Sequence, residues 1–265
     1  MTLFEAFILG IVQGLTEFLP VSSSGHIELG TYLFGIKAAD NLLFSVVVHA
    51  ATALSTIVVF RKDILFIFQD IFKFKWNGGT EFTFKIIVSM IPVGIVGLLY
   101  EEEVSSFFGG RILFVGFMLL ITATLLTFSH YSFKREGTVT FPKALIIGLA
   151  QAVAILPGIS RSGATISTAL LLGIDRESAA RFSFLMVLVP IIGASLLKLL
   201  NFMEDPSIAE GVSGGSLVAG FIAAFITGLL ACVWMINIVK KGKLIYFAIY
   251  CAVVGCIAIM AGLYL

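Results

Sequence analysis

The chain has 265 residues, of which 59% are hydrophobic and only 12% are charged, and its formal net charge is +1. Charged residues make up about a quarter of an ordinary soluble domain, so this composition excludes that class. Nucleic-acid binding is also excluded, because it needs a basic footprint that this charge does not provide. The expected fold is an all-α polytopic membrane protein.

The first apolar region, residues 3–35, is interrupted in its middle by Pro20. A helix needs about 20 apolar residues to span a membrane, and each half of this region is shorter than that. We therefore expect a re-entrant helix pair, which enters the membrane, turns at a polar tip and leaves by the same face. A second such pair is expected over residues 143–174, where Pro157 and Gly158 interrupt the apolar run.

Six further stretches are long and apolar enough to span a membrane. They cover roughly residues 42–60, 83–100, 112–130, 182–200, 216–238 and 244–263. Between the first two, residues 61–81 alternate apolar and charged positions at helical spacing, which predicts an amphipathic helix in the membrane interface. Basic residues gather in the loops around 61–85, 134–143 and 240–243, which include Lys134 and Arg135. These loops are predicted to be cytoplasmic, with the C-terminus outside.

Residues 8–45 and 146–183 carry matching Gln, Pro, Ser and Gly residues, such as Gln13 with Gln151. The helices that follow the two segments are predicted to run in opposite directions. We therefore expect one membrane domain, residues 1–265, built of two inverted repeats at about 1–135 and 136–265. In transporters of this design the tips of broken helices from both halves meet near the midplane. Residues 20–26 and 157–165 should then face each other in one cavity.

Both predicted tips concentrate polar residues that are costly in a membrane and are functional by default. The first tip offers Gln13 and Glu17 on one helix face, followed by Ser22, Ser23, Ser24, Gly25 and His26. The second tip offers Ser160, Arg161, Ser162, Gly163 and Thr165. A glycine-containing loop that opens a helix presents free N–H groups to an anion, and a guanidinium adds a preference for phosphate.

A serine close to a histidine and a carboxylate resembles an activated nucleophile. The residues alone therefore predict phosphoryl transfer or hydrolysis on a phosphate that carries an apolar tail. The alternative is a structural buried pair of Glu17 and Arg161, with the hydroxyl groups bonded to the backbone. His49, in the middle of the first span, is expected to bond to a neighbouring helix more readily than to line the cavity.

The stretches QGLTEFLPVSSSGH (residues 13–26) and PGISRSGAT (157–165) resemble the two signature motifs of the undecaprenyl-diphosphatase family. These are membrane phosphatases associated with bacitracin resistance. The resemblance implies hydrolysis of a polyprenyl diphosphate to the monophosphate, in the bacterial cytoplasmic membrane, at a site open toward the outer face. It also implies a divalent cation, Mg²⁺ or Ca²⁺.

By the same resemblance, Glu17 and His26 are essential, Arg161 binds phosphate, and Ser23 is a nucleophile. Glu17 could hold the metal or act on a proton, and positioning of the metal or the diphosphate is the favoured role. The choice between serine and histidine as the attacking group stays open. The remaining motif residues are expected to bind substrate: Gln13, Ser22, Ser24, Gly25, Ser160, Ser162, Gly163 and Thr165. Gln13 stands where many members of the family carry glutamate, which places the carboxylate chemistry on Glu17.

Two functions remain open from the sequence. The leading one is a membrane phosphatase, and the other is a flippase or transporter for polyprenyl phosphate that uses the same cavity. The expected partners are the polyprenyl diphosphate and the membrane lipids, with a homodimer as a further option and no nucleic acid.

Overall fold

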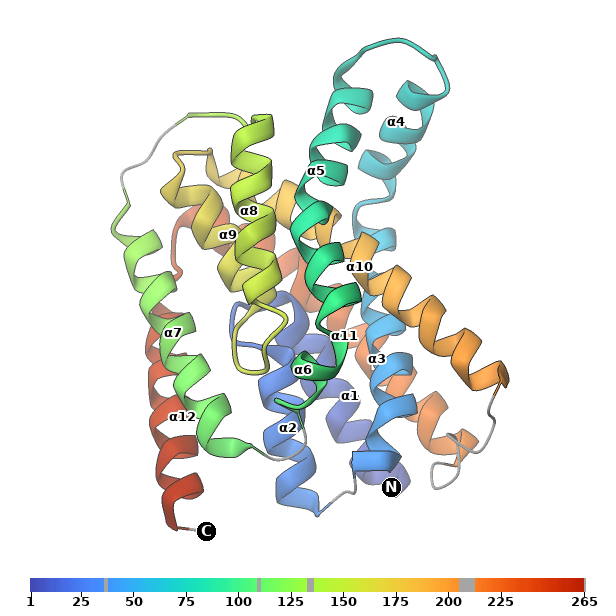
Figure 1. Ribbon diagram of the computed structural model, residues 1–265, viewed down its shortest axis with the longest axis vertical. Helices are drawn as coiled ribbons and strands as arrows, with labels where there is room; N and C mark the ends of the chain where they lie inside the picture. Colours follow the sequence, from blue (N-terminus) through green and yellow to red (C-terminus); the bar gives the residue numbers. More distant parts are fainter. Residues whose placement is uncertain (36–37, 109–110, 133–135, 205–212, 265) are drawn as a thin grey trace.

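A computed structural model describes residues 1–35, 38–108, 111–132, 136–204 and 213–264. In these residues the chain forms twelve helices and one isolated parallel bridge, between Gly137 and Ile174. Figure 1 shows their arrangement, and the helices are α1 (Leu3–Phe18), α2 (Ser23–Phe34), α3 (Ala38–Val59), α4 (Arg61–Ile71), α5 (Gly78–Leu99), α6 (Glu101–Ser105), α7 (Ile112–His130), α8 (Phe141–Val153), α9 (Arg161–Leu171), α10 (Arg176–Glu204), α11 (Gly214–Lys241) and α12 (Ile245–Tyr264). Lys134, Arg135 and the predicted repeat boundary beside them lie outside the described residues.

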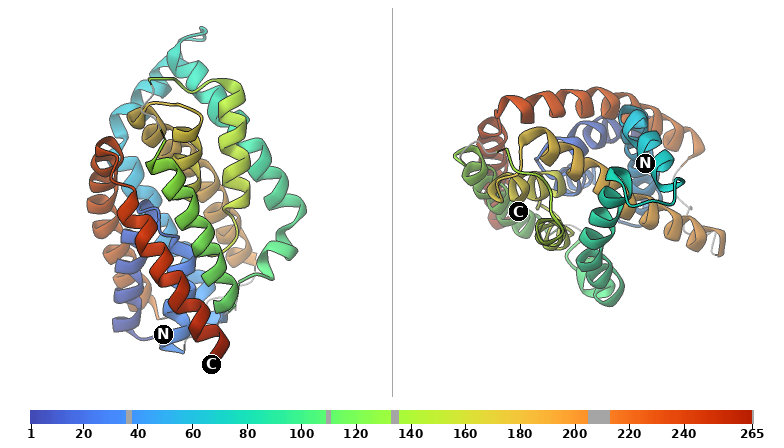
Figure 2. Two further views of the ribbon diagram at one scale, coloured as in Figure 1. Left: turned by 90° about the vertical axis from the view of Figure 1, so that its left-hand side faces the viewer. Right: turned by 90° about the horizontal axis from the view of Figure 1, so that it is seen from above.

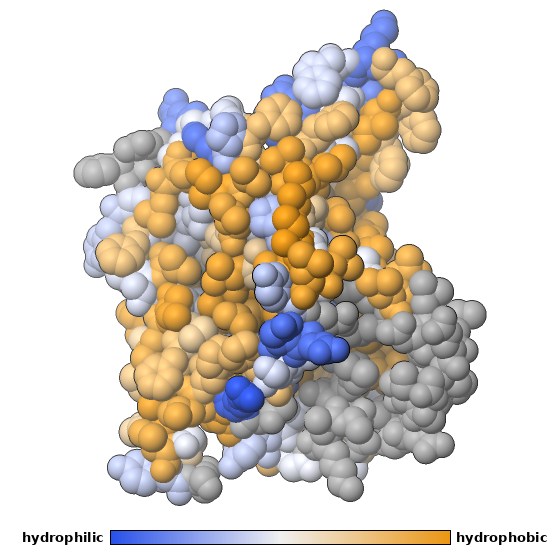
Figure 3. Space-filling model, in the orientation of Figure 1, coloured by the Kyte–Doolittle hydropathy of each residue, from blue (hydrophilic) through white to orange (hydrophobic). Residues whose placement is uncertain are grey.

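The long helices confirm an all-α polytopic membrane protein. Within the described residues, five helices are long and apolar enough to cross a membrane, namely α5, α7, α10, α11 and α12. A sixth crossing is counted if α3 and the bent α4 form one span, which agrees with the six stretches read from the sequence. Apolar residues cover much of the face seen in Figure 3, while hydrophilic residues gather at its upper tip, above α4 and α5.

The helix predicted over residues 61–81 is shorter than expected. It ends at Ile71 and is bent by 75° from the preceding span. Asp70 closes the turn that follows, because its carboxylate accepts from the Gly79 N–H at 3.0 Å and from the Lys73 ammonium at 2.7 Å. Asn77 then caps α5 by accepting from the Thr80 N–H at 2.9 Å, so this span begins before residue 83.

The two predicted broken-helix regions both form helical hairpins. Leu19 adopts an extended conformation before Pro20, as the residue before a proline prefers, and this ends α1. In Figure 1 the α1–α2 hairpin comes from the lower end of the molecule and the α8–α9 hairpin from the upper end, and their tips meet in the middle. This arrangement agrees with the expected convergence of the tips, whereas the duplication proposed to explain it stays a prediction.

Helices from the two halves of the chain pack against each other. α1 lies along α11, and α12 lies along α7, as Figure 2 shows for the second pair. Small residues permit the first contact: a Cβ on Gly14 would lie 2.6 Å from the Ala224 carbonyl oxygen and 2.9 Å from the Gly228 nitrogen. The α1–α2 hairpin is therefore held by a helix that ends more than 200 residues later in the chain.

Gly14→Ala should lower the stability of the folded protein. The added methyl group would overlap backbone atoms of α11, and overpacking of this kind costs about 1–3 kcal/mol. The matched control is Gly97→Ala in α5, where a Cβ would meet nothing within 4 Å. We expect the thermal unfolding midpoint in detergent to fall for Gly14→Ala and not for Gly97→Ala. Equal midpoints for Gly14→Ala and the wild type would contradict the close α1–α11 contact.

Candidate active site at the hairpin tips

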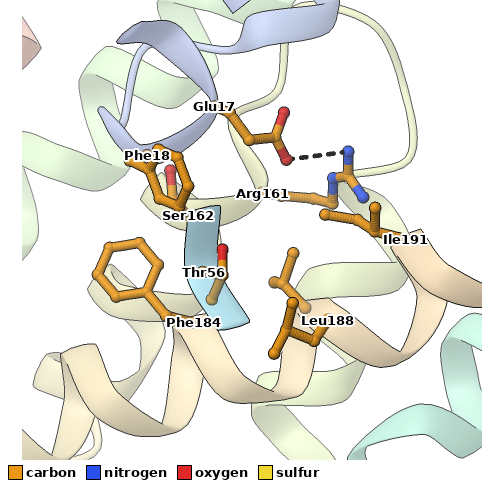
Figure 4. A pocket seen from close by; sticks show the side chains of 9 residues that line it. Glu17, Phe18, Thr56, Arg161, Ser162, Phe184, Leu188 and Ile191 are labelled. Carbon is orange, nitrogen blue, oxygen red and sulfur yellow. Dashed lines mark hydrogen bonds and ion pairs between the residues drawn. The ribbon is translucent and has the colours of Figure 1, made fainter. Parts of the chain in front are cut away.

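Glu17 lies at the centre of the region where the two tips meet, and its side chain is only 6% exposed. Its Oε2 accepts hydrogen bonds from Gln13 Nε2 at 2.9 Å and from Ser23 Oγ at 2.6 Å. Its Oε1 lies 3.5 Å from a guanidinium nitrogen of Arg161, which comes from the other hairpin (Figure 4). One buried carboxylate thus links both tips.

The local backbone explains how Ser23 reaches Glu17. Ser22 has φ 71° and ψ 92°, a conformation that residues other than glycine rarely adopt. Such a conformation costs about 1–3 kcal/mol and persists only where the surroundings impose it. The Ser22 side chain caps α2 by accepting from the Gly25 N–H at 3.2 Å, and the sharp turn brings Ser23 back over the end of α1.

The second tip is built by a similar cap and is fastened to α7. Ser160 Oγ accepts from the Gly163 N–H at 3.0 Å, so α9 begins at Arg161. Thr122 of α7 accepts from the Ser160 N–H at 3.1 Å and donates to the Gly158 carbonyl at 3.1 Å. These contacts position Arg161 at the first turn of a helix, where the N–H groups have no partner within the helix.

Direct contacts join the two tips. Ser162 Oγ donates to the Leu19 carbonyl oxygen at 3.2 Å. A Cβ on Gly25 would lie 3.1 Å from the Gly158 Cα, so the backbones approach closely where both tips carry glycine. Residues 20–26 and 157–165 therefore lie against each other as expected, whereas the cavity predicted between them stays a prediction.

The remaining predicted site residues make hydrogen-bond contacts within their own tips. Ser24 Oγ lies 3.4 Å from Ser22 Oγ, and Ser160 Oγ lies 3.2 Å from Ser162 Oγ. Thr165 is fully buried and donates to the Arg161 carbonyl at 2.9 Å, within its own helix. The hydroxyl groups of Ser160, Ser162 and Thr165 therefore hold the second tip together, and their predicted contacts with substrate stay predictions.

His26 does not have the partner that the sequence suggested. Its Nδ1 lies 2.8 Å from the Ser22 carbonyl oxygen, and its Nε2 lies 2.8 Å from the hydroxyl of Tyr250 in α12. The predicted nucleophile, Ser23, is bonded to Glu17. In this structure the group placed to accept the proton of Ser23 is thus the carboxylate and not the imidazole.

Two more residues lie near these groups, His49, which was expected to contact a neighbouring helix, and Tyr250, which was not predicted. His49 Nε2 lies 3.7 Å from Glu17 Oε2, while its Nδ1 lies 2.7 Å from the Ser45 carbonyl oxygen, so His49 faces the site. This contact agrees with the expectation that His49 meets a neighbouring helix, since Glu17 belongs to α1. Tyr250 had no signal in the sequence, because tyrosine is common in membrane helices and its contact with His26 joins residues 224 positions apart.

A small pocket opens beside the Glu17–Arg161 pair. Its polar wall is made by these two side chains together with Ser162 and Thr56. Its apolar wall comes from α1 and α10 and consists of Phe18, Phe184, Val187, Leu188 and Ile191, most of which are visible in Figure 4. A charged group beside an apolar wall suits an amphiphile that has an anionic head and a hydrocarbon tail.

Comparisons with known proteins find similarity over nearly the whole length of the chain. The model of a family described as bacitracin resistance protein BacA matches residues 6–257. A protein of Bacteroides fragilis named undecaprenyl-diphosphatase is 55% identical over 261 residues, which is 98% of each chain. A protein of the same name from Christiangramia forsetii is 57% identical over 262 residues, again 98% of each chain. The similarity therefore extends over nearly the whole chain and includes both tips.

Proposed function

The chain belongs to the bacitracin resistance protein BacA family, and on that premise we propose that it is an integral membrane phosphatase acting on undecaprenyl diphosphate. The products are undecaprenyl monophosphate, the lipid carrier used in cell-wall synthesis, and inorganic phosphate. The observation that carries the proposal is the hydrogen bond of 2.6 Å between Ser23 Oγ and the buried Glu17 carboxylate, beside Arg161.

Arg161 and the start of α9 bind the diphosphate group of the substrate. The guanidinium carries a fixed positive charge and can bind two phosphate oxygens at once. Its contact with Glu17, at 3.5 Å, is longer than a strong charge-assisted hydrogen bond, so the guanidinium can turn toward a phosphate while it stays beside the carboxylate. The first N–H groups of α9 add donors for an anion at the same place.

Ser23 is the proposed nucleophile. Glu17 Oε2 removes the hydroxyl proton while Oγ attacks the terminal phosphorus of the diphosphate. A bond from Oγ to phosphorus forms and the bond from phosphorus to the bridging oxygen breaks, so undecaprenyl monophosphate leaves and a phosphoserine remains. Water then attacks the phosphoserine and releases inorganic phosphate, while Glu17 returns its proton to Ser23 Oγ as the bond from oxygen to phosphorus breaks.

His26 is the proposed base of the second step. Because a carbonyl oxygen can only accept, the contact with Ser22 places a hydrogen on Nδ1 and leaves Nε2 with a lone pair in the neutral ring. Such a nitrogen can take a proton from the attacking water. His26 follows Ser23 by three positions and therefore lies on the same side of α2.

The site also suits a divalent cation, Mg²⁺ or Ca²⁺, that is bound by protein oxygens and by the substrate phosphates together. The described residues contain no group of three His, Cys, Asp or Glu side chains that could hold a metal ion alone. Gln13 Oε1, however, is a buried oxygen without a hydrogen-bond partner among them, next to Glu17. Magnesium is commonly bound by one or two protein oxygens together with substrate phosphates. Glu17 and Gln13 would hold the cation, which neutralises charge on the diphosphate when bound.

The proposed location is the bacterial cytoplasmic membrane, with the site reached from the outer face. Two contacts support this orientation, because they join basic segments at one end of the molecule. His130 bonds to the Gly242 carbonyl at 3.1 Å, and Lys240 pairs with Glu177 at 2.9 Å. Both chain termini lie at the opposite end in Figures 1 and 2, which is also the end from which the α1–α2 hairpin starts. Basic ends of membrane proteins face the cytoplasm.

The proposed function is tested by phosphate release from undecaprenyl diphosphate by the purified protein in detergent with Mg²⁺ or Ca²⁺. We expect the wild type to release phosphate, and a chelator to stop the reaction until the cation is restored. Ser23→Ala should be inactive, whereas Ser106→Ala, at an exposed position, should match the wild type. If the wild type releases no phosphate but carries the lipid across vesicle membranes, the transporter function is the correct one.

A further inference from the structure

Tyr250 makes two contacts with His26 from α12, a helix that packs mainly against α7. Its hydroxyl lies 2.8 Å from His26 Nε2. The two rings are stacked, with their centroids 5.6 Å apart and their planes 12° from parallel. α12 packs mainly against α7, so these contacts are not a by-product of extensive packing between α12 and α2.

The direction of the hydrogen bond follows from the other side of the ring. The Ser22 carbonyl accepts from Nδ1, which leaves Nε2 as the acceptor in the neutral imidazole. The Tyr250 hydroxyl must then be the donor to Nε2. The ring is therefore held between a main-chain acceptor and a side-chain donor, an arrangement that fixes both its tautomer and its plane.

The neighbouring residue supplies a second link between α12 and the same tip. Cys251 Sγ lies 3.6 Å from the Pro20 carbonyl oxygen, a distance within the range of a sulfur hydrogen bond. Consecutive residues of α12 thus contact the turn before α2 and the ring one turn inside it. Tyr250 is 43% exposed, so it lies between His26 and the apolar exterior of the protein.

From these contacts we propose that Tyr250 is a positioning residue for His26, an inference that rests on the proposed function. Its hydroxyl keeps Nε2 in the acceptor state and aims the ring until a phosphorylated substrate and its water replace the hydroxyl. Tyr250 itself takes no part in bond making or breaking, and its contribution appears in the rate of turnover and not in substrate binding.

Tyr250→Phe is the direct test, because it keeps the stacked ring and removes only the hydroxyl. We expect kcat to fall about tenfold, because the imidazole is no longer held in the orientation and tautomer that the step needs, with KM within about twofold of the wild type. The matched control is Tyr246→Phe, one turn earlier in α12 and 65% exposed, which should leave kcat unchanged. An unchanged kcat in Tyr250→Phe overturns the proposal, as does a fall that comes entirely from KM.

A second measurement tests the contact between Tyr250 and His26 without measuring phosphate release. Diethyl pyrocarbonate acylates imidazole nitrogens that hold a free lone pair, and the chain contains only three histidines, His26, His49 and His130. Mass spectrometry can follow each of them in one digest. In Tyr250→Phe we expect His26 to react faster than in the wild type, with the other two rates unchanged. Equal rates at His26 in both proteins overturn the proposed contact.

The two measurements also separate this inference from the proposed function. A wild type that releases no phosphate contradicts the phosphatase, while the acylation rates still test whether Tyr250 masks Nε2. An active wild type with an unchanged kcat in Tyr250→Phe contradicts the role of Tyr250 alone. A thermal unfolding midpoint for each variant checks that it is folded, and Tyr250→Leu, which lacks both ring and hydroxyl, should lose at least as much kcat as Tyr250→Phe.

Discussion

Glu17→Gln is expected to lower kcat for phosphate release by about 100- to 10,000-fold, the usual contribution of a general base. A glutamine side chain has the shape of the glutamate and can still contact Gln13 and Ser23, but it cannot take the proton of Ser23. It also removes the anion that Arg161 faces at 3.5 Å. Phosphate release under saturating lipid, with the variant checked for its unfolding midpoint, gives the measurement.

Gln13→Glu is the matched comparison. It makes the reverse change, from glutamine to glutamate, one helical turn earlier in α1. The bond of 2.9 Å from Gln13 to Glu17 would be replaced by two neighbouring carboxyl groups, which can share a proton or hold a cation. We expect this variant to keep its activity. A folded Glu17→Gln variant that turns over like the wild type would refute the role given to Glu17.

Arg161→Ala should lower kcat/KM by about 1000-fold or more, the range reported for arginines that stabilise charge in phosphoryl transfer. Arg161→Lys should recover only part of this loss, since a lysine keeps the charge but cannot bind two phosphate oxygens side by side. The lysine variant should therefore show the larger part of its defect in KM. Initial rates over a range of lipid concentrations separate the two constants.

The same arginine also has a measurable effect on stability. Removing one partner of a buried ion pair costs about 3–5 kcal/mol, because the other charge stays buried without compensation. Glu17 retains contacts with His49, Ser23 and Gln13, so the loss for Arg161→Ala should fall at the lower end. Combining Glu17→Gln with Arg161→Ala should restore the unfolding midpoint but not the activity. A double variant less stable than either single variant would show that the two side chains do not act as a pair.

The positions of the main reactive groups followed from short-range features of the sequence. Gln13 and Glu17 are four residues apart, which fixes them on one helix face, and Pro20 ends the helix directly after them. The shared Ser–Gly pattern of the two tips indicated that Glu17 and Arg161 belong to one site, although they are 144 residues apart. Serine caps at Ser22 and Ser160 are likewise local features, and both are present.

The bonding partners within the site could not be predicted in the same way. Whether Ser23 bonds to Glu17 or to His26 depends on the Ser22 backbone, whose positive φ has no signature in a serine. The contact between Tyr250 and His26 depends on how α12 lies against α7, and no pattern within α12 marks one tyrosine over another. The start of α5 at Gly78 was missed for a simpler reason, since Asn77 and the carboxylate of Asp70 form a turn inside a stretch that alternates like one helix.

The pairing of Glu17 with Arg161 has a consequence for how the protein is made. Ribosomes add about 5–20 residues per second, so a separation of 144 residues delays the arginine by about 7–30 seconds. The helix that packs along α1 is synthesised later still, since α11 begins at Gly214. During this interval the first hairpin lacks both the Arg161 guanidinium and α11, the helix against which α1 packs. We therefore expect ribosome-bound chains that end before α9 to leave Glu17 accessible to water-soluble carboxyl reagents, with protection only in chains that include α11.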